Sequence, residues 1–396
     1  MAEPAPSLRV IGLMSGTSFD AVDAGAAEFA FDGDAITLRP LGLVSRPYPA
    51  EIRDALADAL PPSTASAAKL CELDTLIGRF FAEVAATAID ELADGSADLI
   101  SSHGQTVFHW VEAGEALGTL QLGQPAWIAE RTGCPVVSDL RSRDIAAGGQ
   151  GAPLVGLFDV LWLRSRPGRP VALNLGGIAN ITVDIGTDRP LAYDTGPANA
   201  LLDAAIRSVT GQPYDRDGAR AARGTIRPEL LDRLLAEPYY GQGGPKSTGK
   251  ELFNLDYLRG FVPDLGPESL DDVLATLTEL TARSVADAIG RHDPTEVVVA
   301  GGGLRNPTLA GRLAAALGPV PLVPAEELGL AGQAKEAYLF ALLGFLTAHG
   351  LPGSLPSCTG ARHPSVLGSI TPGRGPLRTL PDPRPPKSLE ILPFGR

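Results

Sequence analysis

The sequence predicts an α/β protein of two domains, each built on a mixed β-sheet, and three observations lead to this prediction. The chain has 396 residues, which is longer than a single hydrophobic core usually serves. Three strands followed by a helix are predicted twice along it, an order typical of a mixed sheet when further helices and strands follow. The first turn of each copy is rich in glycine: GLMSGTSFD begins at residue 12 and NLGGIAN at residue 174. Two such halves would enclose a cleft, the commonest place for a ligand.

The first copy begins near the amino terminus with a continuous apolar run, which is typical of a buried strand. Asp32-Gly33 is a hairpin turn signal between the second and third strands. Apolar residues at spacings of three and four then predict an amphipathic helix. In order, we expect strands over 8–14, 24–31 and 35–44, a helix over 73–88 and a strand over 98–101.

The second copy repeats this order after the stretch from Pro167 to Pro170, which we interpret as a linker. Its last strand, EVVVA, runs directly into three glycines at 301–303. A further apolar segment, 337–348, is too short to span a bilayer and is predicted to be a buried helix. In order, we expect strands over 171–175, 180–185 and 191–194, helices over 198–209 and 270–288 and a strand over 296–300.

These elements place the N-terminal domain at residues 1–142 and the C-terminal domain at residues 143–358. The segment from about residue 359 is expected to return to the first domain. Residues 373–396 are rich in proline, so we expect them to form an irregular tail.

Composition narrows the class of protein. A net charge of −13 argues against a nucleic-acid groove or an anionic membrane as the main partner, although backbone N–H groups and a bound cation can still accommodate a nucleotide. The three cysteines show no CxxC spacing, which argues against a disulfide framework or a zinc site. Residues 1–7 lack the basic start and apolar stretch of a signal peptide, so we expect a cytoplasmic protein.

Small residues follow the first strand in the stretch Gly16-Thr17-Ser18-Phe19-Asp20. They would let the backbone approach an anion closely, with N–H groups and hydroxyls as donors. Asp20 and Asp23 could hold Mg²⁺ through water, because this ion keeps most of its hydration shell. The alternative is a hairpin turn with solvated carboxylates. Gly176-Gly177 lies at the equivalent turn of the second copy, so the two turns could clamp a triphosphate, with the glycines at 301–303 at its adenosine end.

Asp194 follows a predicted strand and precedes a predicted helix, where a carboxylate could act as a general base or as an ordinary helix N-cap. Asp215 and Asp217 are competing carboxylates, for which an Asx turn is the alternative. Polar residues in HGQT (103–106) and DLRSRD (139–144) suit the hydroxyls of a sugar, although a structural histidine and an ion-pair network are the alternatives. The stretch KSTGK at 246–250 lacks the strand-then-helix context of a phosphate loop, so we assign it no phosphate-binding role.

These motifs, in this order, resemble the anhydro-N-acetylmuramic acid kinase family, which belongs to the superfamily of sugar kinases, Hsp70 and actin. The resemblance covers the chain to about Gly373. The motifs that carry it are GLMSGTSFDAVD, SSHGQT, SDLRSRDIAAGGQGAPLV, NLGGIANIT, DTGPANALLDA, DRDGARAARG, KSTGKELFN, VVVAGGGLRN and CTGARHPSVLGSITPG. It implies two actin-like (ribonuclease H-like) domains with mixed sheets around a central ATP cleft.

The resemblance further implies an enzyme that uses ATP and Mg²⁺ to open the 1,6-anhydro ring of anhydro-N-acetylmuramic acid and phosphorylate O6, in peptidoglycan recycling. Asp194 would be the base that activates water, and Asp20 could hold Mg²⁺ through water. The implied sugar-binding residues are Gln105, Thr106, Arg141, Arg143 and Glu336. The implied ATP-binding residues are Gly16, Thr17, Ser18, Phe19, Asp20, Ala21, Val22, Asp23, Gly176, Gly177, Gly301, Gly302, Gly303 and Asn306. A homodimer is a further expectation from the family.

Two alanines depart from the family pattern: Ala21 and Ala198 stand where glycine is usual. A methyl group obstructs a positive φ, so the sequence leaves the geometry of the first turn open. Two other functions remain open as well. A kinase for another 1,6-anhydrosugar, such as levoglucosan, would share the chemistry, and an actin-like ATP-binding or phosphatase-like protein would share the glycine turns.

Overall fold

The computed structural model describes residues 7–60, 63–184, 190–244, 246–249, 251–377, 380 and 383–394. The chain divides into two compact units: Met1–Ser165 with Gly329–Arg396, and Arg166–Leu328. This division differs from the expected domain boundaries at 142/143 and about 359. The segments 143–165 and 329–358 belong to the first unit because their main helices pack on its sheet and on each other.

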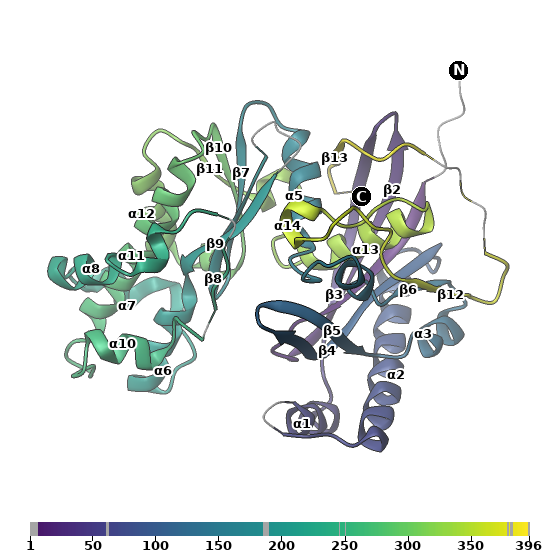
Figure 1. Ribbon diagram of the computed structural model, residues 1–396, viewed down its shortest axis with the longest axis horizontal. Helices are drawn as coiled ribbons and strands as arrows, with labels where there is room; N and C mark the ends of the chain where they lie inside the picture. Colours follow the sequence, from purple (N-terminus) through teal and green to yellow (C-terminus); the bar gives the residue numbers. More distant parts are fainter. Residues whose placement is uncertain are drawn as a thin grey trace. The chain divides into compact units, whose positions relative to one another are not determined.

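The first unit is built on an eight-stranded mixed sheet with the order β12-β6-β4-β1-β2-β3-β13, and β5 pairs with β4 (Figure 1). The strands β1, β2 and β3 form an antiparallel meander, whereas β4 runs parallel to β1 and β6 parallel to β4. The strands are β1 (Leu8–Ser15), β2 (Ala21–Asp32), β3 (Ala35–Pro47), β4 (Leu99–Glu112), β5 (Glu115–Leu122), β6 (Val136–Ser138), β12 (Ser369–Thr371) and β13 (Ser388–Ile391).

Helix α13 lies against the strands of this sheet and is buried along almost its whole length, as predicted for its apolar sequence. A Cβ atom at Gly12 of β1 would lie 1.9 Å from the carbonyl oxygen of Ala337, so only glycine allows the helix to approach this closely. Among the described residues, no helix is long and apolar enough to cross a membrane. The helices of the unit are α1 (Ala50–Ala59), α2 (Ala67–Leu92), α3 (Pro125–Thr132), α4 (Ser142–Ala146), α5 (Val155–Arg164), α13 (Lys335–Ala348) and α14 (Pro356–Thr359).

The second unit is built on a five-stranded sheet with the order β11-β10-β7-β8-β9. Its strands are β7 (Pro170–Leu175), β8 (Ile178–Val183), β9 (Leu191–Pro197), β10 (Glu296–Ala300) and β11 (Leu322–Pro324). Its α-helices are α6 (Asn199–Thr210), α7 (Ala219–Arg223), α8 (Pro228–Leu235), α9 (Pro238–Gly241), α10 (Leu255–Phe261), α11 (Leu270–Gly290) and α12 (Pro307–Leu317). Three short 3₁₀ segments, Arg216–Gly218, Gly302–Arg305 and Ala325–Leu328, complete it.

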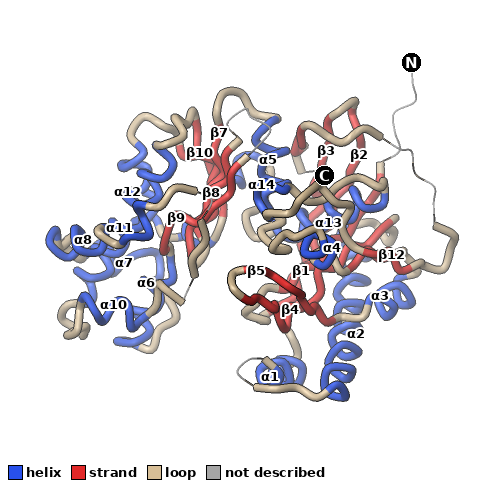
Figure 2. Tube along the Cα trace, in the orientation of Figure 1, coloured by secondary structure: helices blue, strands red, loops and turns tan. Residues whose placement is uncertain are grey.

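The two sheets repeat one topology. The path β3-β2-β1-β4-β6 of the first unit has the same order and strand directions as β9-β8-β7-β10-β11 of the second. Both units combine helices with strands (Figure 2). The predicted fold class, α/β with a duplicated mixed sheet, is confirmed.

Several elements were not predicted. Helix α1 and the β4–β5 hairpin are absent from the predicted order, and the strand expected over 98–101 is the start of the longer β4. The tail is not irregular throughout, because β13 pairs in parallel with β3. Since β12 pairs with β6, the C-terminal segment supplies the strands at both ends of the order β12-β6-β4-β1-β2-β3-β13. Residues 378–379, 381–382 and 395–396 of the tail, and Ile185 of the strand predicted over 180–185, lie outside the described residues.

Candidate active site

The turn between β1 and β2 spans residues 16–20 and has one anchored residue. Phe19 has a φ of 43°, and its N–H donates to the carbonyl oxygen of Gly16 at 3.1 Å. The Phe19 ring packs against the core of the first unit. Thr17, Ser18 and Asp20 are exposed. The turn therefore presents two hydroxyls and one carboxylate to solvent from a fixed backbone.

The two alanines that replace family glycines fit without a left-handed backbone. Ala21 is the first residue of β2 and pairs with Pro47 of β3. Ala198 precedes α6 with a φ of −106°. The residue of the first turn that adopts a positive φ is Phe19, so the methyl group of Ala21 does not obstruct the turn.

Gln105 of β4 holds this turn in place through hydrogen bonds, and its side chain is fully buried. Its Oε1 accepts hydrogen bonds from Ser15 Oγ at 2.6 Å and from Tyr48 OH at 3.2 Å. Its Nε2 donates to the carbonyl oxygens of Gly16 and Thr106, both at 3.2 Å. An amide offers two donors and two acceptor sites, so all four are used within the protein. Sequence reasoning assigned no role to Ser15, although it lies in the motif GLMSGTSFDAVD, or to Tyr48, which carries no motif signal.

His103 lies in the same strand, β4, and its buried ring pairs with the partly buried Arg141. Arg141 Nε donates to His103 Nε2 at 2.9 Å, and Arg141 also donates to the carbonyl oxygen of Gly151 at 2.6 Å. His103 Nδ1 lies 2.9 Å from the carbonyl oxygen of Gly104, which assigns the ring proton to Nδ1. Burial, and secondly the Arg141 charge, lower the pKa of His103 to about 3. His103 is therefore a neutral acceptor that orients Arg141.

Glu336 lies in the first turn of α13 and is exposed to solvent. Desolvation by the surrounding protein raises the pKa of its carboxyl group, and Asp23 raises it further, whereas Lys335 and Arg141 lower it. Asp23, Arg141 and Glu336 are therefore electrostatic neighbours in the first unit. Among the other predicted sugar contacts, Arg143 is exposed, and the Thr106 hydroxyl accepts from Gln121 Nε2 at 3.1 Å.

The glycine turns of the second unit lie against one another. The Gly176 and Gly177 carbonyl oxygens accept hydrogen bonds from the backbone N–H groups of residues 198–200 at the start of α6. Gly301 has a φ of 101°, and a Cβ atom there would lie 2.7 Å from the carbonyl oxygen of Leu175. A Cβ atom at Gly303 would lie 2.8 Å from Leu175 Cβ. The structure thus brings together two glycine motifs that are far apart in the sequence.

A pocket of about 610 Å³ adjoins these turns, a size that suits a small-molecule ligand. Asn306 caps α12, because its Oδ1 accepts from the N–H of Leu309 at 3.0 Å, and it leaves no room for a side chain at Gly218. Asp215 accepts from the N–H groups of Arg220 and Ala221, both at 3.0 Å, and is a structural cap. The pocket is lined by Asn199, Leu202, Asp203, Tyr214, Asp215, Arg216, Asp217, Gly302, Arg305 and Asn306.

Asp194 lies within β9, and α6 is capped at Ala198, so Asp194 is not a helix N-cap. Its Oδ2 accepts from Ser247 Oγ at 3.0 Å and from the Thr248 N–H at 2.9 Å. Its Oδ1 accepts no hydrogen bond from any residue that the structure describes. Burial raises the pKa of Asp194, and the two hydrogen bonds lower it. A partly buried carboxylate with one unused oxygen is suited to accept a proton.

The contact between Asp194 and the stretch at 246–249 was not predicted. The sequence did contain the signal, because KSTGK stood out as a polar motif, but no local pattern indicated that it would fold back on β9. For metals, the described part of the chain has no group of three or more His, Cys, Asp or Glu side chains that could hold an ion.

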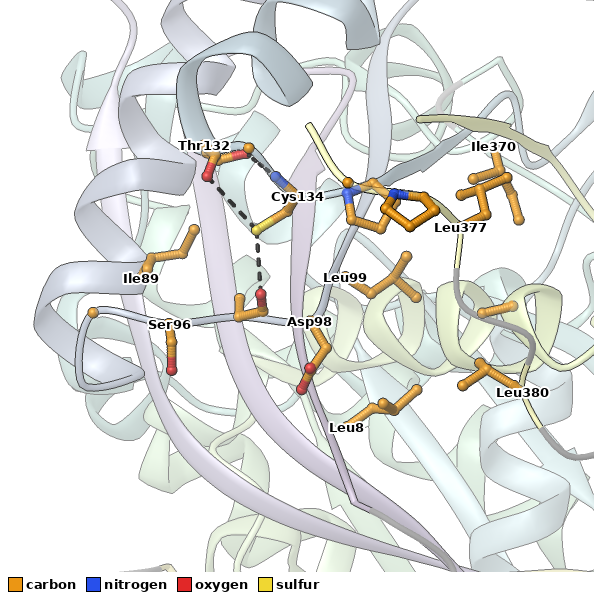
Figure 3. A pocket seen from close by; sticks show the side chains of 17 residues that line it. Leu8, Ile89, Ser96, Asp98, Leu99, Thr132, Cys134, Ile370, Leu377 and Leu380 are labelled. Atoms are coloured by element: carbon orange, nitrogen blue, oxygen red, sulfur yellow. Dashed lines mark hydrogen bonds between the residues drawn. The ribbon is translucent and has the colours of Figure 1, made fainter. Parts of the chain in front are cut away.

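Another pocket, of about 510 Å³, lies in the first unit and contains none of the predicted site residues (Figure 3). Leucine and isoleucine side chains surround it, together with the Cys134 thiol, which donates to the carbonyl oxygen of Ala97 at 3.2 Å. Leu377 and Leu380 of the tail form part of its wall.

Comparison with solved structures finds distant similarity. A ROK family glucokinase from Streptomyces griseus in complex with glucose and AMPPNP is 14% identical, with a TM-score of 0.36 over 85% of this chain and 99% of that one. An activator of 2-hydroxyisocaproyl-CoA dehydratase from Clostridium difficile with bound ADPNP is 12% identical, with a TM-score of 0.39 over 85% of this chain and 94% of that one.

Comparison with protein sequences is decisive. A sequence model of the family described as anhydro-N-acetylmuramic acid kinase matches residues 8–373. A relative of that name from Rhodococcus erythropolis is 59% identical over 394 residues, which cover 97% of this chain and 99% of the relative. Another from Streptomyces avermitilis is 60% identical over 376 residues, which cover 94% of this chain and 97% of the relative. The chain belongs to the anhydro-N-acetylmuramic acid kinase family.

Proposed function

We propose that this protein is an ATP-dependent kinase that opens the 1,6-anhydro ring of anhydro-N-acetylmuramic acid and phosphorylates O6. The product is N-acetylmuramic acid 6-phosphate, and the reaction serves peptidoglycan recycling in the cytoplasm. The observation that carries the proposal is the hydrogen bonding of Asp194 in a chain of this family. Its carboxylate is held at Oδ2 by Ser247 and Thr248, and its Oδ1 is left unused by the described residues.

In the proposed reaction, Asp194 Oδ1 accepts a proton from a water molecule. The water oxygen forms a bond to C1 of the sugar, and the C1–O6 bond of the anhydro bridge breaks. O6 then forms a bond to the γ-phosphorus of ATP. The bond between that phosphorus and the oxygen that joins the β- and γ-phosphates breaks, and ADP leaves with this oxygen. A positioned base of this kind typically contributes about 10²–10⁴-fold to the rate.

For the nucleotide, we propose that the first turn (16–23) and the glycine turns of the second unit bind phosphate through backbone N–H groups and hydroxyls. The pocket beside Asn306 would take the adenosine. Mg²⁺, when bound, would neutralise charge on the transferring phosphoryl group. Asp20 fits such an ion because its carboxylate is exposed on the turn, and Mg²⁺ bound mainly by phosphate and water needs only one or two carboxylates.

For the sugar, we propose Thr106, Arg141, Arg143 and Glu336 as contacts. Arg141 is the better supported arginine, because His103 orients it and Glu336 is its electrostatic neighbour. Gln105 is better explained as an anchor of the first turn, since its amide is fully used within the protein. We also propose a homodimer, on the basis of the family alone.

The test is to incubate the protein with ATP and Mg²⁺ and either anhydro-N-acetylmuramic acid or levoglucosan, and to identify the products by mass. We expect one phosphoryl group and one water added to anhydro-N-acetylmuramic acid. Phosphorylation of levoglucosan alone would overturn the proposed substrate. ATP hydrolysis without any sugar phosphate would exclude a sugar kinase and favour a phosphatase-like activity.

A further inference from the structure

We propose that Ser247 and Thr248 are positioning residues for Asp194: they hold Oδ2 so that Oδ1 faces the reacting water. This inference rests on the proposed function, because it assigns a task to residues behind the proposed base. Nothing in the motif KSTGK itself indicates such a task.

The segment around Ser247 fixes Asp194 at three of its polar groups. The backbone N–H of Asp194 donates to the carbonyl oxygen of Lys246 at 3.0 Å, and the Asp194 carbonyl oxygen accepts from Tyr239 OH at 2.8 Å. The side chain then accepts from Ser247 and Thr248 at Oδ2. Backbone and side chain of Asp194 are therefore held by Tyr239 and by residues 246–248, and the carboxylate has little freedom to rotate.

The same two hydrogen bonds keep Asp194 ionised. Burial and the nearby Glu251 carboxylate both raise the pKa of Asp194, which would weaken it as a base near neutral pH. The Thr248 N–H and the Ser247 hydroxyl lower this pKa. Other charged groups near this stretch, among the described residues, include Glu237, whose Oε1 accepts from the Tyr239 N–H at 3.4 Å, and Lys246, whose ammonium lies 4.3 Å from the centre of the Tyr239 ring. Burial, and secondly the charge of Arg291, lowers the pKa of the Lys246 ammonium group.

Ser247 is the residue to change. Thr248 acts through its backbone N–H, and its buried hydroxyl has no hydrogen-bond partner among the described residues, so replacing its side chain would leave the contact with Asp194 in place. In Ser247 the side-chain hydroxyl itself donates to Asp194 Oδ2. Because this side chain is exposed, the variant Ser247→Ala should fold.

The experiment measures the pH profile of kcat/KM for Ser247→Ala, for Ser247→Thr, which keeps the hydroxyl, and for the matched control Ser208→Ala. Ser208 is exposed on α6 and donates to the carbonyl oxygen of Ala205, away from Asp194. In Ser247→Ala we expect the acid limb of the kcat/KM profile to move to higher pH by about one pH unit, and kcat to fall by roughly tenfold. Ser247→Thr should restore most of both, and Ser208→Ala should match the wild type.

A second measurement does not depend on sugar phosphorylation. The carboxyl carbon of Asp194 is titrated by NMR in protein labelled with ¹³C-aspartate, and its signal is identified by its absence in Asp194→Asn. An unshifted titration and an unshifted acid limb in Ser247→Ala would overturn the positioning role while leaving the kinase assignment intact. If the wild type forms no sugar phosphate, the proposed function fails instead, even where the NMR titration shifts in Ser247→Ala.

Discussion

Ser15 and Gln105 join the first turn to the neighbouring strand β4. Ser15 Oγ donates to Gln105 Oε1 at 2.6 Å, and Gln105 Nε2 donates to the carbonyl oxygen of Gly16 at 3.2 Å. Gln105→Leu keeps the approximate size of the side chain and removes every hydrogen bond. Buried partners left unsatisfied cost about 1–3 kcal/mol each, so we expect the free energy of unfolding to fall by about 2–4 kcal/mol. Urea denaturation measures this change. A variant as stable as the wild type would show that the turn does not depend on Gln105.

Asp194→Asn should abolish turnover while nucleotide binding persists. The amide keeps the shape of the side chain but cannot accept the proton from water, so kcat should fall by about 10²-fold or more. Product formation by mass and ATP binding by calorimetry measure the two effects separately.

The matched control is Asp256→Asn, which changes an exposed aspartate on α10 of the same unit. It should leave kcat unchanged. Substantial residual turnover in Asp194→Asn would remove Asp194 from the role of base.

Much of the fold was predictable because strong local patterns coincide with it. Continuous apolar runs predicted β1 and β10, and apolar spacing predicted α2 and α11. The glycine motifs near Gly176 and Gly301 were also visible in the sequence, and at Gly301 and Gly303 the close approach of Leu175 leaves no room for a side chain. The tail strand β13 was not predictable, since its pairing with β3 is decided by a partner some 350 residues earlier in the chain.

The site shows the same limit. The end of a predicted strand drew attention to Asp194, and the motif DLRSRD drew attention to Arg141, but the partners of both residues are set by tertiary contacts. Ser247 reaches Asp194 across 53 residues of sequence, and His103 reaches Arg141 across 38. A histidine that serves as a neutral acceptor has no sequence pattern that distinguishes it from an ordinary core histidine.

His103 should make the stability of the first unit depend on pH. Its pKa is about 3 when folded and about 6.5 when unfolded, so between these values the unfolded state binds the extra proton. Stability therefore falls as pH drops below about 6.5, by about 1.4 kcal/mol for each pH unit. His103→Gln keeps an acceptor for Arg141 but does not titrate, so its stability should depend less steeply on pH. Urea denaturation of both proteins between pH 4.5 and 6.5 measures the difference, and equal slopes would contradict the lowered pKa.

Ala21→Gly restores the residue usual in the family, and we expect it to bring no gain. Ala21 is in an extended strand, where glycine costs about 0.5–1 kcal/mol through its greater freedom in the unfolded chain. The KM for ATP should stay the same, because Phe19 adopts the positive φ of the turn. A clearly lower KM for ATP in the variant would show that the methyl group does distort the nucleotide-bound turn.

Lys335 and Asp159 form a buried ion pair, with Lys335 Nζ 2.5 Å from Asp159 Oδ1 and both side chains less than a tenth exposed. Lys335→Met removes the ammonium group of this buried pair, and breaking a buried pair by removing one member typically costs about 3–5 kcal/mol. Lys335→Met combined with Asp159→Leu removes both charges, so most of the lost stability should return. The three tryptophans, Trp110, Trp127 and Trp162, all lie in the first unit, so their fluorescence during urea denaturation reports on the unit that contains the pair. If the double variant is no more stable than Lys335→Met, the loss comes from packing around α13 and not from the broken ion pair.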